Sequence, residues 1–303
     1  MLLLKILVLA AVQGAAELLP VSSSAHVIVA EKLMGLNPTS PQMTLLLVML
    51  HTGTMFAVIY YFWDSWKAGF FASRKVFINS LKLIAAATFF TGVVGLALKS
   101  VIEKFFLRGV AHAQIEMIFG NLNIIAAALA AVGVMIIYSQ WKARPLPASP
   151  KKELSMGTEV HGEHMDSSVD LKGSSFIGII QGLCLPFRGF SRSGATISAG
   201  MLLGMAKDRA EEFSFALAVV LTPPVVAREV WRVFKDQKIP MAGLHGMAGA
   251  FYPSLLGMAM SFIAGVLALK WLSNWLSRGR WHFFGIYCLA ASAVVFALHL
   301  KGF

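Results

Sequence analysis

The sequence predicts an all-α polytopic membrane protein arranged as an inverted-topology repeat, each half a re-entrant helical hairpin followed by three transmembrane helices. Hydrophobic residues make up 57% of the 303 residues and charged residues only 14%, whereas roughly a quarter of a soluble domain is charged. Apolar runs of spanning length recur along the chain, and helices explain runs of that length better than strands do. Two short polar motifs, one in each half, are similar to one another, which indicates an internal duplication.

The first element is a re-entrant hairpin at residues 3–36, and its counterpart lies at residues 174–205. Each consists of two apolar pieces, interrupted by Pro, Gly and Ser, that are individually too short to cross a hydrocarbon core of roughly 30 Å. Helices broken in this way are tolerated at membrane depth only where protein or water satisfies the freed backbone groups. We therefore expect both segments to turn back within the bilayer.

Three apolar runs follow each hairpin, and each is long enough to span the bilayer as a helix. A hairpin returns to its own side, whereas three spans cross an odd number of times. The second copy therefore begins from the opposite face, as in an inverted repeat. The predicted spans are 42–63, 81–102, 115–138, 213–233, 247–269 and 283–300.

A soluble linker loop at 141–173 separates the two halves, which makes residues 1–140 the first repeat and residues 174–303 the second. The linker is rich in Pro, Ser, His and acidic residues. Its His161 and His164 lie near acidic residues, but a solvated loop explains this composition better than a metal site.

The formal net charge of +11 does not indicate nucleic-acid binding in a chain of this kind. In membrane proteins, Lys and Arg in loops reflect orientation and anionic lipid headgroups. Basic residues in the connections after the first and fifth spans favour a cytoplasmic location for that face, although the other face also carries basic residues. The basic residues of these two connections are Lys67, Arg74, Lys75, Lys82, Lys270, Arg278 and Arg280. The two cysteines show neither a disulfide framework nor metal-ligand spacing.

The first polar motif places an acid, a hydroxyl and an imidazole at a helix break. Gln13 and Glu17 are four residues apart and share one helix face. Pro20 ends that helix, and a following serine caps the next one, whose free N–H groups and dipole would seat an anion such as phosphate. Ser23 and His26 are three apart, and a hydroxyl beside a base is the minimum for nucleophilic attack. An interhelical polar contact or a structural histidine is the alternative.

The second motif supplies a fixed positive charge. Arg192 lies between Ser191 and Ser193, and its planar guanidinium suits phosphate oxygens. Gly194 in the same turn would let backbone amides approach an anion closely. For Arg188, a phosphate role and a structural role, such as pairing with an acid, are equally compatible with the sequence.

Three other polar residues receive less functional weight. His51 lies within the first span and would line the cavity. Glu211 and Glu212 follow Lys207 and Arg209, so we expect both acids at the membrane interface.

These motifs resemble those of the undecaprenyl-diphosphate phosphatase family, also called UppP or BacA. The similarity extends over nearly the whole chain and is carried by residues 12–26 (VQGAAELLPVSSSAH) and 189–200 (GFSRSGATISAG). Residues 212–215 (EFSF) and the pattern of spans add support.

The resemblance implies hydrolysis of the lipid undecaprenyl diphosphate to its monophosphate. This reaction recycles the lipid carrier for peptidoglycan synthesis and lowers sensitivity to bacitracin. The resemblance also implies a divalent cation, Mg²⁺ or Ca²⁺, as cofactor. It implies the bacterial cytoplasmic (inner) membrane as the location, with the active site facing the periplasmic or outer side. The implied partners are the lipid substrate and the surrounding membrane lipids. Whether the chain forms a homodimer is left open.

Carried over by motif position, the resemblance implies Ser23 as nucleophile, His26 as general base or leaving-group acid, and Arg192 as phosphate clamp. Glu17 would be catalytic and would bind the cation. The residues implied to bind substrate are Gln13, Ser22, Ser191, Ser193, Gly194 and Thr196.

The chain departs from the family pattern at two positions. Many members carry a glutamate where Gln13 stands, and proline is frequent where this chain has Arg188. The amide at position 13 removes one anionic cation ligand. The main alternative function is a secondary transporter or lipid translocase, which broken helices in an inverted repeat would serve equally well.

Overall fold

A computed structural model describes residues 2–36, 41–106, 121–142, 169–235 and 244–301, and these residues form helices and their connections without any strand. The helices are α1 (Leu2–Leu18), α2 (Ser23–Leu33), α3 (Pro41–Gly69), α4 (Arg74–Val101) with a π-helical continuation (Ile102–Phe106), α5 (Leu122–Lys142), α6 (Leu171–Cys184), α7 (Arg192–Leu202), α8 (Lys207–Lys235), α9 (Leu244–Ser277) and α10 (His282–Leu300).

Six of the described helices are long and apolar enough to cross a membrane, as the sequence predicts. They are α3, α4, α5, α8, α9 and α10. The third predicted span begins at residue 115, but α5 begins at Leu122, and residues 107–120 lie outside the described part of the chain. Most of the predicted linker, with His161 and His164, also lies outside it. Because six described helices have the length and composition of membrane spans, the chain is a multi-pass membrane protein.

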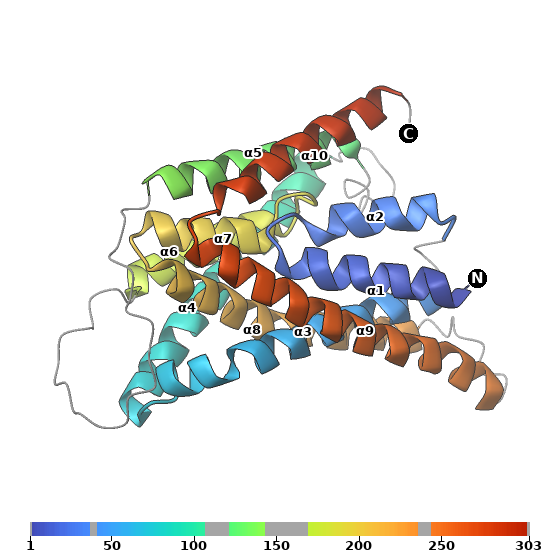
Figure 1. The fold of residues 1–303 in the computed structure, drawn as a ribbon, viewed down its shortest axis with the longest axis horizontal. Coiled ribbons are helices and arrows are strands. Elements are labelled where there is room, and N and C mark those ends of the chain that lie inside the picture. Colours follow the sequence, from blue (N-terminus) through green and yellow to red (C-terminus); the bar gives the residue numbers. More distant parts are fainter. Residues whose placement is uncertain (1, 37–40, 107–120, 143–168, 236–243, 302–303) are drawn as a thin grey trace.

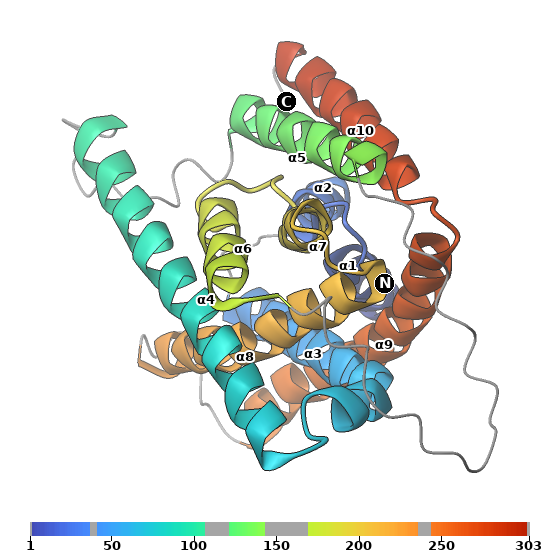
Figure 2. The ribbon, with the colours of Figure 1, turned by 90° about the vertical axis from the view of Figure 1, so that its left-hand side faces the viewer.

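The remaining four helices form two short hairpins in the middle of the molecule. The α1–α2 pair enters from one end of the bundle and the α6–α7 pair from the other, and their tips meet near the centre (Figure 1). Seen along the bundle, the longer helices surround them (Figure 2). Both hairpins thus have the short, paired helices expected for re-entrant segments, and the surrounding protein encloses their breaks.

Glycines let the first helix of each hairpin pack closely against a span of the other half. A Cβ on Gly14 would lie 2.7 Å from the carbonyl oxygen of Ser261 in α9. A Cβ on Gly182 would lie 3.0 Å from the carbonyl oxygen of Thr91 in α4. The pairs α1–α9 and α6–α4 therefore correspond, and this correspondence is compatible with the predicted inverted repeat.

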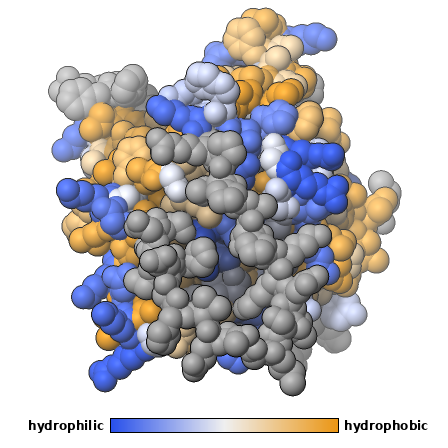
Figure 3. All heavy atoms as spheres, turned by 60° about the vertical axis from the view of Figure 1, so that its left-hand side comes forward, coloured by the Kyte–Doolittle hydropathy of each residue, from blue (hydrophilic) through white to orange (hydrophobic). Residues whose placement is uncertain are grey.

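The outer surface matches a lipid environment. In the view of Figure 3, hydrophobic residues cover much of the flanks, and hydrophilic residues gather among the described side chains of the end turned towards the viewer. The α3–α4 and α9–α10 connections lie at this same end (Figure 1). The basic residues of the two connections therefore share one face, as the loop charges predict.

The acids at the start of α8 are buried against neighbouring helices. Glu211 is 3% exposed and accepts a hydrogen bond from Ser273 in α9. Glu212 is 8% exposed, accepts a hydrogen bond from Ser65 in α3, and pairs with Arg209 at 3.0 Å. The first turns of α8 lie between α3 and α9, and this burial is invisible in the local sequence.

Close packing of the second hairpin gives a testable expectation. A Cβ on Gly178 would lie 2.2 Å from the carbonyl oxygen of Ala87, which cannot move aside as a side chain would. We expect Gly178→Leu to destabilise the protein by about 1–3 kcal/mol or more. Thermal unfolding in detergent, followed by a thiol-reactive dye on the buried Cys184 and Cys288, measures the effect. Gly92→Leu is the control, since no atom lies within 4 Å of its Cβ position, and an equal fall in both midpoints would contradict the packing argument.

Candidate active site

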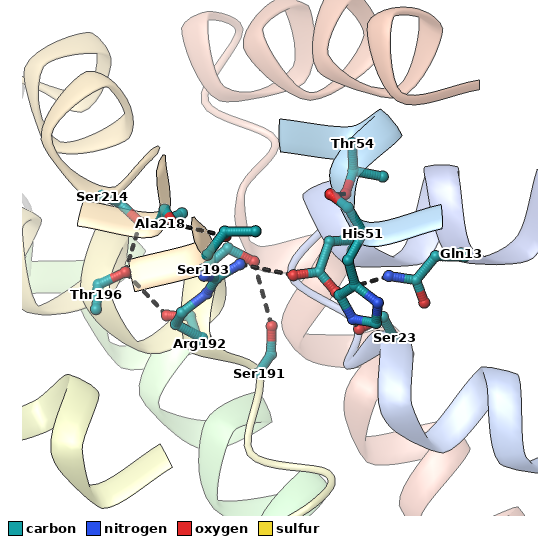
Figure 4. Close-up of polar contacts among 12 residues, drawn as sticks. Gln13, Ser23, His51, Thr54, Ser191, Arg192, Ser193, Thr196, Ser214 and Ala218 are labelled. Carbon is teal, nitrogen blue, oxygen red and sulfur yellow. Dashed lines mark hydrogen bonds and ion pairs between the residues drawn. The ribbon is translucent and has the colours of Figure 1, made fainter. Parts of the chain in front are cut away.

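The carboxylate of Glu17, in the last turn of α1, is the centre of the polar cluster between the two hairpins. Its Oε1 accepts a hydrogen bond of 2.7 Å from the guanidinium of Arg192, the first residue of α7 (Figure 4). Its Oε2 accepts a hydrogen bond of 2.6 Å from the hydroxyl of Ser23, the first residue of α2. One carboxylate therefore joins the starts of both inner helices, which lie 169 positions apart (192 − 23).

Two further side chains reach the same carboxylate. The Nε2 amide of Gln13 donates to Oε2 of Glu17 at 3.1 Å, which confirms that the two residues share a helix face. The Nε2 of His51 in α3 lies 3.8 Å from the same oxygen. The Nδ1 of His51 is 2.8 Å from the carbonyl oxygen of Leu47, and a carbonyl can only accept, so Nδ1 carries the proton. The Nε2 side of the His51 ring thus faces Glu17.

The break between α1 and α2 follows from its residues. Pro20 has no N–H to continue the helix, and α1 ends at Leu18. Ser22 adopts a φ of +68°, a left-handed conformation that is uncommon for a residue with a side chain. This conformation reverses the chain immediately before Ser23 and points the start of α2 towards Glu17. Strained backbone of this kind occurs often at functional sites.

The start of α7 is fixed by serines and by close contact with the first hairpin. Ser191 is the N-cap, and its hydroxyl accepts a hydrogen bond of 3.3 Å from the backbone N–H of Gly194. Ser193 donates to the carbonyl oxygen of Leu19 at 3.4 Å, across the two hairpin tips. A Cβ on Gly194 would lie 3.2 Å from Cβ of Pro20. These contacts hold the two tips against one another.

Thr196 anchors α7 from its other side. Its hydroxyl donates to the carbonyl oxygen of Arg192 at 2.9 Å and pairs with the hydroxyl of Ser214 in α8 (Figure 4). Ser214 belongs to the EFSF segment, which sequence reasoning connected with the motifs only as general support. The structure gives the segment a role, since it holds the helix that carries Arg192.

Accessibility separates the side chains that a ligand meets from those that support them. The side chains of Glu17, Arg192 and His51 are 16%, 23% and 44% exposed. The supporting residues are all buried, with exposures of 5% or less: Gln13, Ser22, Ser191, Ser193 and Thr196. An anion would therefore meet Arg192 and His51 first, and the other predicted binding residues would act by holding the site in shape.

His26 does not pair with Ser23 among the contacts of the described residues. Its Nδ1 lies 2.8 Å from the carbonyl oxygen of Ser22, and its Nε2 is hydrogen-bonded to the hydroxyl of Tyr287 in α10. The hydroxyl of Ser23 donates to Glu17 instead. The motif spacing correctly puts His26 and Ser23 on one short helix, but the neighbours of each side chain come from elements far along the chain.

Arg188, in the connection between α6 and α7, acts electrostatically on Glu31 of α2. Glu31 is only 3% exposed, and its Oε1 has no hydrogen-bond partner among the described residues. Sequence reasoning did not single out Glu31, because an acid followed by a lysine near a helix end resembles an ordinary surface position.

The donor set at Glu17 fits a cation that is shared with a substrate. No group of three or more His, Cys, Asp and Glu side chains suited to a metal occurs in the described ranges. Mg²⁺ in proteins is usually bound by one or two carboxylates together with substrate phosphates and water. Glu17 offers one carboxylate, and Gln13 and Ser23 add oxygen atoms within the same cluster. This set is sufficient only if the ligand supplies the remaining oxygens.

Comparison with known proteins places this chain in a family. The family model described as "Bacitracin resistance protein BacA" matches residues 6–294. The chain is 52% identical over 297 residues to undecaprenyl-diphosphatase 2 of Acinetobacter baylyi, covering 98% of each chain. It is 32% identical over 294 residues to undecaprenyl-diphosphatase 1 of Burkholderia pseudomallei, covering 93% of this chain and 92% of the relative. It is 29% identical over 299 residues to the undecaprenyl-diphosphatase of Fusobacterium nucleatum, covering 97% and 99%.

The ion pair between the hairpins yields a stability prediction. Removing one partner of a buried pair leaves the other uncompensated, which typically costs about 3–5 kcal/mol, and partial exposure reduces this to about 1–3 kcal/mol here. We expect Glu17→Gln and Arg192→Gln each to lower the unfolding midpoint in detergent, and the double variant to lose less than their sum. Strict additivity of the two losses would show that the pair contributes no coupling.

Proposed function

The chain belongs to the bacitracin resistance protein BacA family, and from this premise we propose that it is an undecaprenyl-diphosphate phosphatase. The enzyme hydrolyses undecaprenyl diphosphate, an isoprenyl lipid, to undecaprenyl phosphate and inorganic phosphate. This recycles the lipid carrier for peptidoglycan synthesis and confers bacitracin resistance.

The observation that carries the proposal is the meeting of Glu17, Ser23 and Arg192 at the facing starts of α2 and α7. A diphosphate needs a fixed cation for its oxygens, a nucleophile near its terminal phosphorus and an acceptor for the nucleophile's proton. Arg192 supplies the fixed cation, Ser23 the nucleophile and Glu17 the proton acceptor. N–H groups at the starts of two inner helices add positive potential to the same region.

In the proposed reaction, Oγ of Ser23 attacks the terminal phosphorus. The Oγ–P bond forms, the bond from phosphorus to the bridging oxygen breaks, and undecaprenyl phosphate leaves. Glu17 Oε2 lies 2.6 Å from Oγ and accepts its proton. A water molecule then attacks the same phosphorus, so that a new O–P bond forms as the Oγ–P bond breaks. Glu17 returns the proton to Oγ, and inorganic phosphate leaves. Direct attack by water at the same phosphorus would use the same groups and give the same products.

The other predicted residues have supporting parts in this proposal. Arg192 stabilises charge on the terminal phosphate oxygens as the bridging bond breaks. His26 acts as leaving-group acid, or as general base towards water, as the family resemblance implies. In the structure its Nε2 is hydrogen-bonded to the Tyr287 hydroxyl, which positions the ring. The buried serines and Thr196 hold the two hairpin tips in register.

We propose a divalent cation, Mg²⁺ or Ca²⁺, held by Glu17 and the substrate phosphates. When bound, such an ion neutralises phosphate charge and polarises the phosphoryl oxygens. Gln13, which donates to Glu17 at 3.1 Å, would rotate its amide to present its oxygen. Arg192 would then turn from Glu17 to the phosphate.

The proposed location is the bacterial cytoplasmic (inner) membrane, with the site open to the periplasmic or outer side. The headgroup would lie between the hairpin tips and the prenyl tail among the lipid-facing spans. One chain supplies every residue of the proposed site, so a homodimer, which remains a prediction, would not be needed to complete it. The other function that the broken helices suit is a secondary transporter or lipid translocase.

An assay of the purified protein in detergent tests the function. We expect phosphate release from undecaprenyl diphosphate, a fall of about 10²–10³-fold in kcat for Arg192→Ala, and near-complete loss for Ser23→Ala. His282→Gln, which removes a side chain at the start of α10 outside the cluster, is the control. In a transporter, substrate flux would survive Ser23→Ala and the wild type would release no phosphate.

The cation can be tested separately. Gln13→Glu places a second carboxylate next to Glu17, so the two acids repel one another until a cation binds between them. We expect this variant to need less Mg²⁺ than the wild type for half-maximal phosphate release. Its thermal unfolding midpoint should also rise more on addition of Mg²⁺. If Mg²⁺ and EDTA leave both proteins unchanged, Glu17 does not hold a cation.

A further inference from the structure

Two neighbouring residues of α10 hold the broken part of the first hairpin. Tyr287 is hydrogen-bonded through its hydroxyl to Nε2 of His26, and the two rings stack with centroids 5.7 Å apart and 17° between their planes. The thiol of Cys288, the next residue, donates to the carbonyl oxygen of Pro20 at 3.2 Å. These contacts join positions 261 and 268 residues apart in the chain. The α10 helix thus contacts the hairpin on both sides of its break.

The hydrogen bonds of His26 fix which nitrogen carries the proton. The carbonyl oxygen of Ser22 can only accept, so Nδ1 of His26 must donate to it. In the neutral ring Nε2 is then an acceptor, and the hydroxyl of Tyr287 donates to it. Tyr287 therefore stabilises one tautomer and one orientation of the His26 ring.

The same ring supports the backbone that precedes Ser23. The carbonyl oxygen of Ser22 accepts from Nδ1 of His26 at 2.8 Å and from the backbone N–H of His26 at 3.5 Å. Ser22 has a φ of +68°, a conformation that persists only where its surroundings enforce it. Ser23 follows directly, and its hydroxyl lies 2.6 Å from Glu17. A continuous series of contacts therefore runs from Tyr287 through His26 and Ser22 to Ser23.

We propose that Tyr287 is a positioning residue for the phosphatase reaction, holding Ser23 in line with Glu17 through His26 and Ser22. The proposal rests on the proposed function and adds to it a residue outside both sequence motifs. Tyr287 acts through His26 and does not itself touch the substrate. Because its side chain is 45% exposed, it is not a core residue whose hydroxyl is merely buried by packing.

Tyr287→Phe tests this with little disturbance, because the ring and its stacking remain and only the hydroxyl is lost. We expect kcat for undecaprenyl diphosphate to fall about 10- to 100-fold, as small misplacements of reacting groups do, while KM stays within about twofold. The split arises because Arg192 and Glu17, which meet the diphosphate, are untouched. Tyr138→Phe, which removes a hydroxyl at the linker end of α5, is the matched control and should keep the wild-type kcat.

A spectroscopic measurement follows the contact itself. In protein labelled with ¹⁵N-histidine, the Nε2 resonance of His26 is assigned by its absence from His26→Gln. We expect Tyr287→Phe to displace this resonance and Tyr138→Phe to leave it in place. An unchanged kcat or an unmoved resonance in Tyr287→Phe overturns the positioning role. Absence of phosphate release by the wild type overturns the proposed function instead, and the resonance still shows whether Tyr287 holds His26.

Discussion

Glu17 and Arg192 carry opposite charges inside the helical bundle, where both side chains are largely shielded from solvent. Each belongs to a different half of the chain, one at the end of α1 and the other at the start of α7, and their atoms approach to 2.7 Å. Because an unpaired charge at membrane depth is costly, this contact constrains how far the two hairpin tips can separate. Three further features hold the two hairpin tips together. They are the serine cap of α7, the contact of Gly194 with Pro20, and the packing of α1 and α6 on spans of the other half.

The same contact explains how a stable arrangement can also be a reactive one. Arg192 has the planar donor fork that suits phosphate, and Glu17 accepts hydrogen bonds from both Ser23 and Gln13. In the proposed function, a diphosphate would pair with Arg192, and a cation would compensate Glu17 for the loss of Arg192. In the proposed function the substrate therefore replaces the ion pair without leaving either charge exposed to lipid.

Residues that the motifs did not reveal come from elements that only folding brings close. His51 reaches Glu17 from the middle of α3, and Tyr287 reaches His26 from α10. The place of His51 in an apolar span indicates a polar role but not its partner, and a tyrosine in a final helix has no local signal. Glu211 and Glu212 likewise have partners that their neighbours in the sequence did not indicate, because α3 and α9 bury them.

The sequence by itself determined the class of protein, the six spanning helices, the two interrupted hairpins and the residues of both motifs. Hydrophobic length and helix-breaking residues act locally, so they can be read directly from the chain. Only the tertiary structure decided the partners: Ser23 with Glu17 rather than His26, and His26 with Tyr287. Side chains on a short helix turn towards whatever surrounds them, and those neighbours are set by the packing of helices that are distant in sequence.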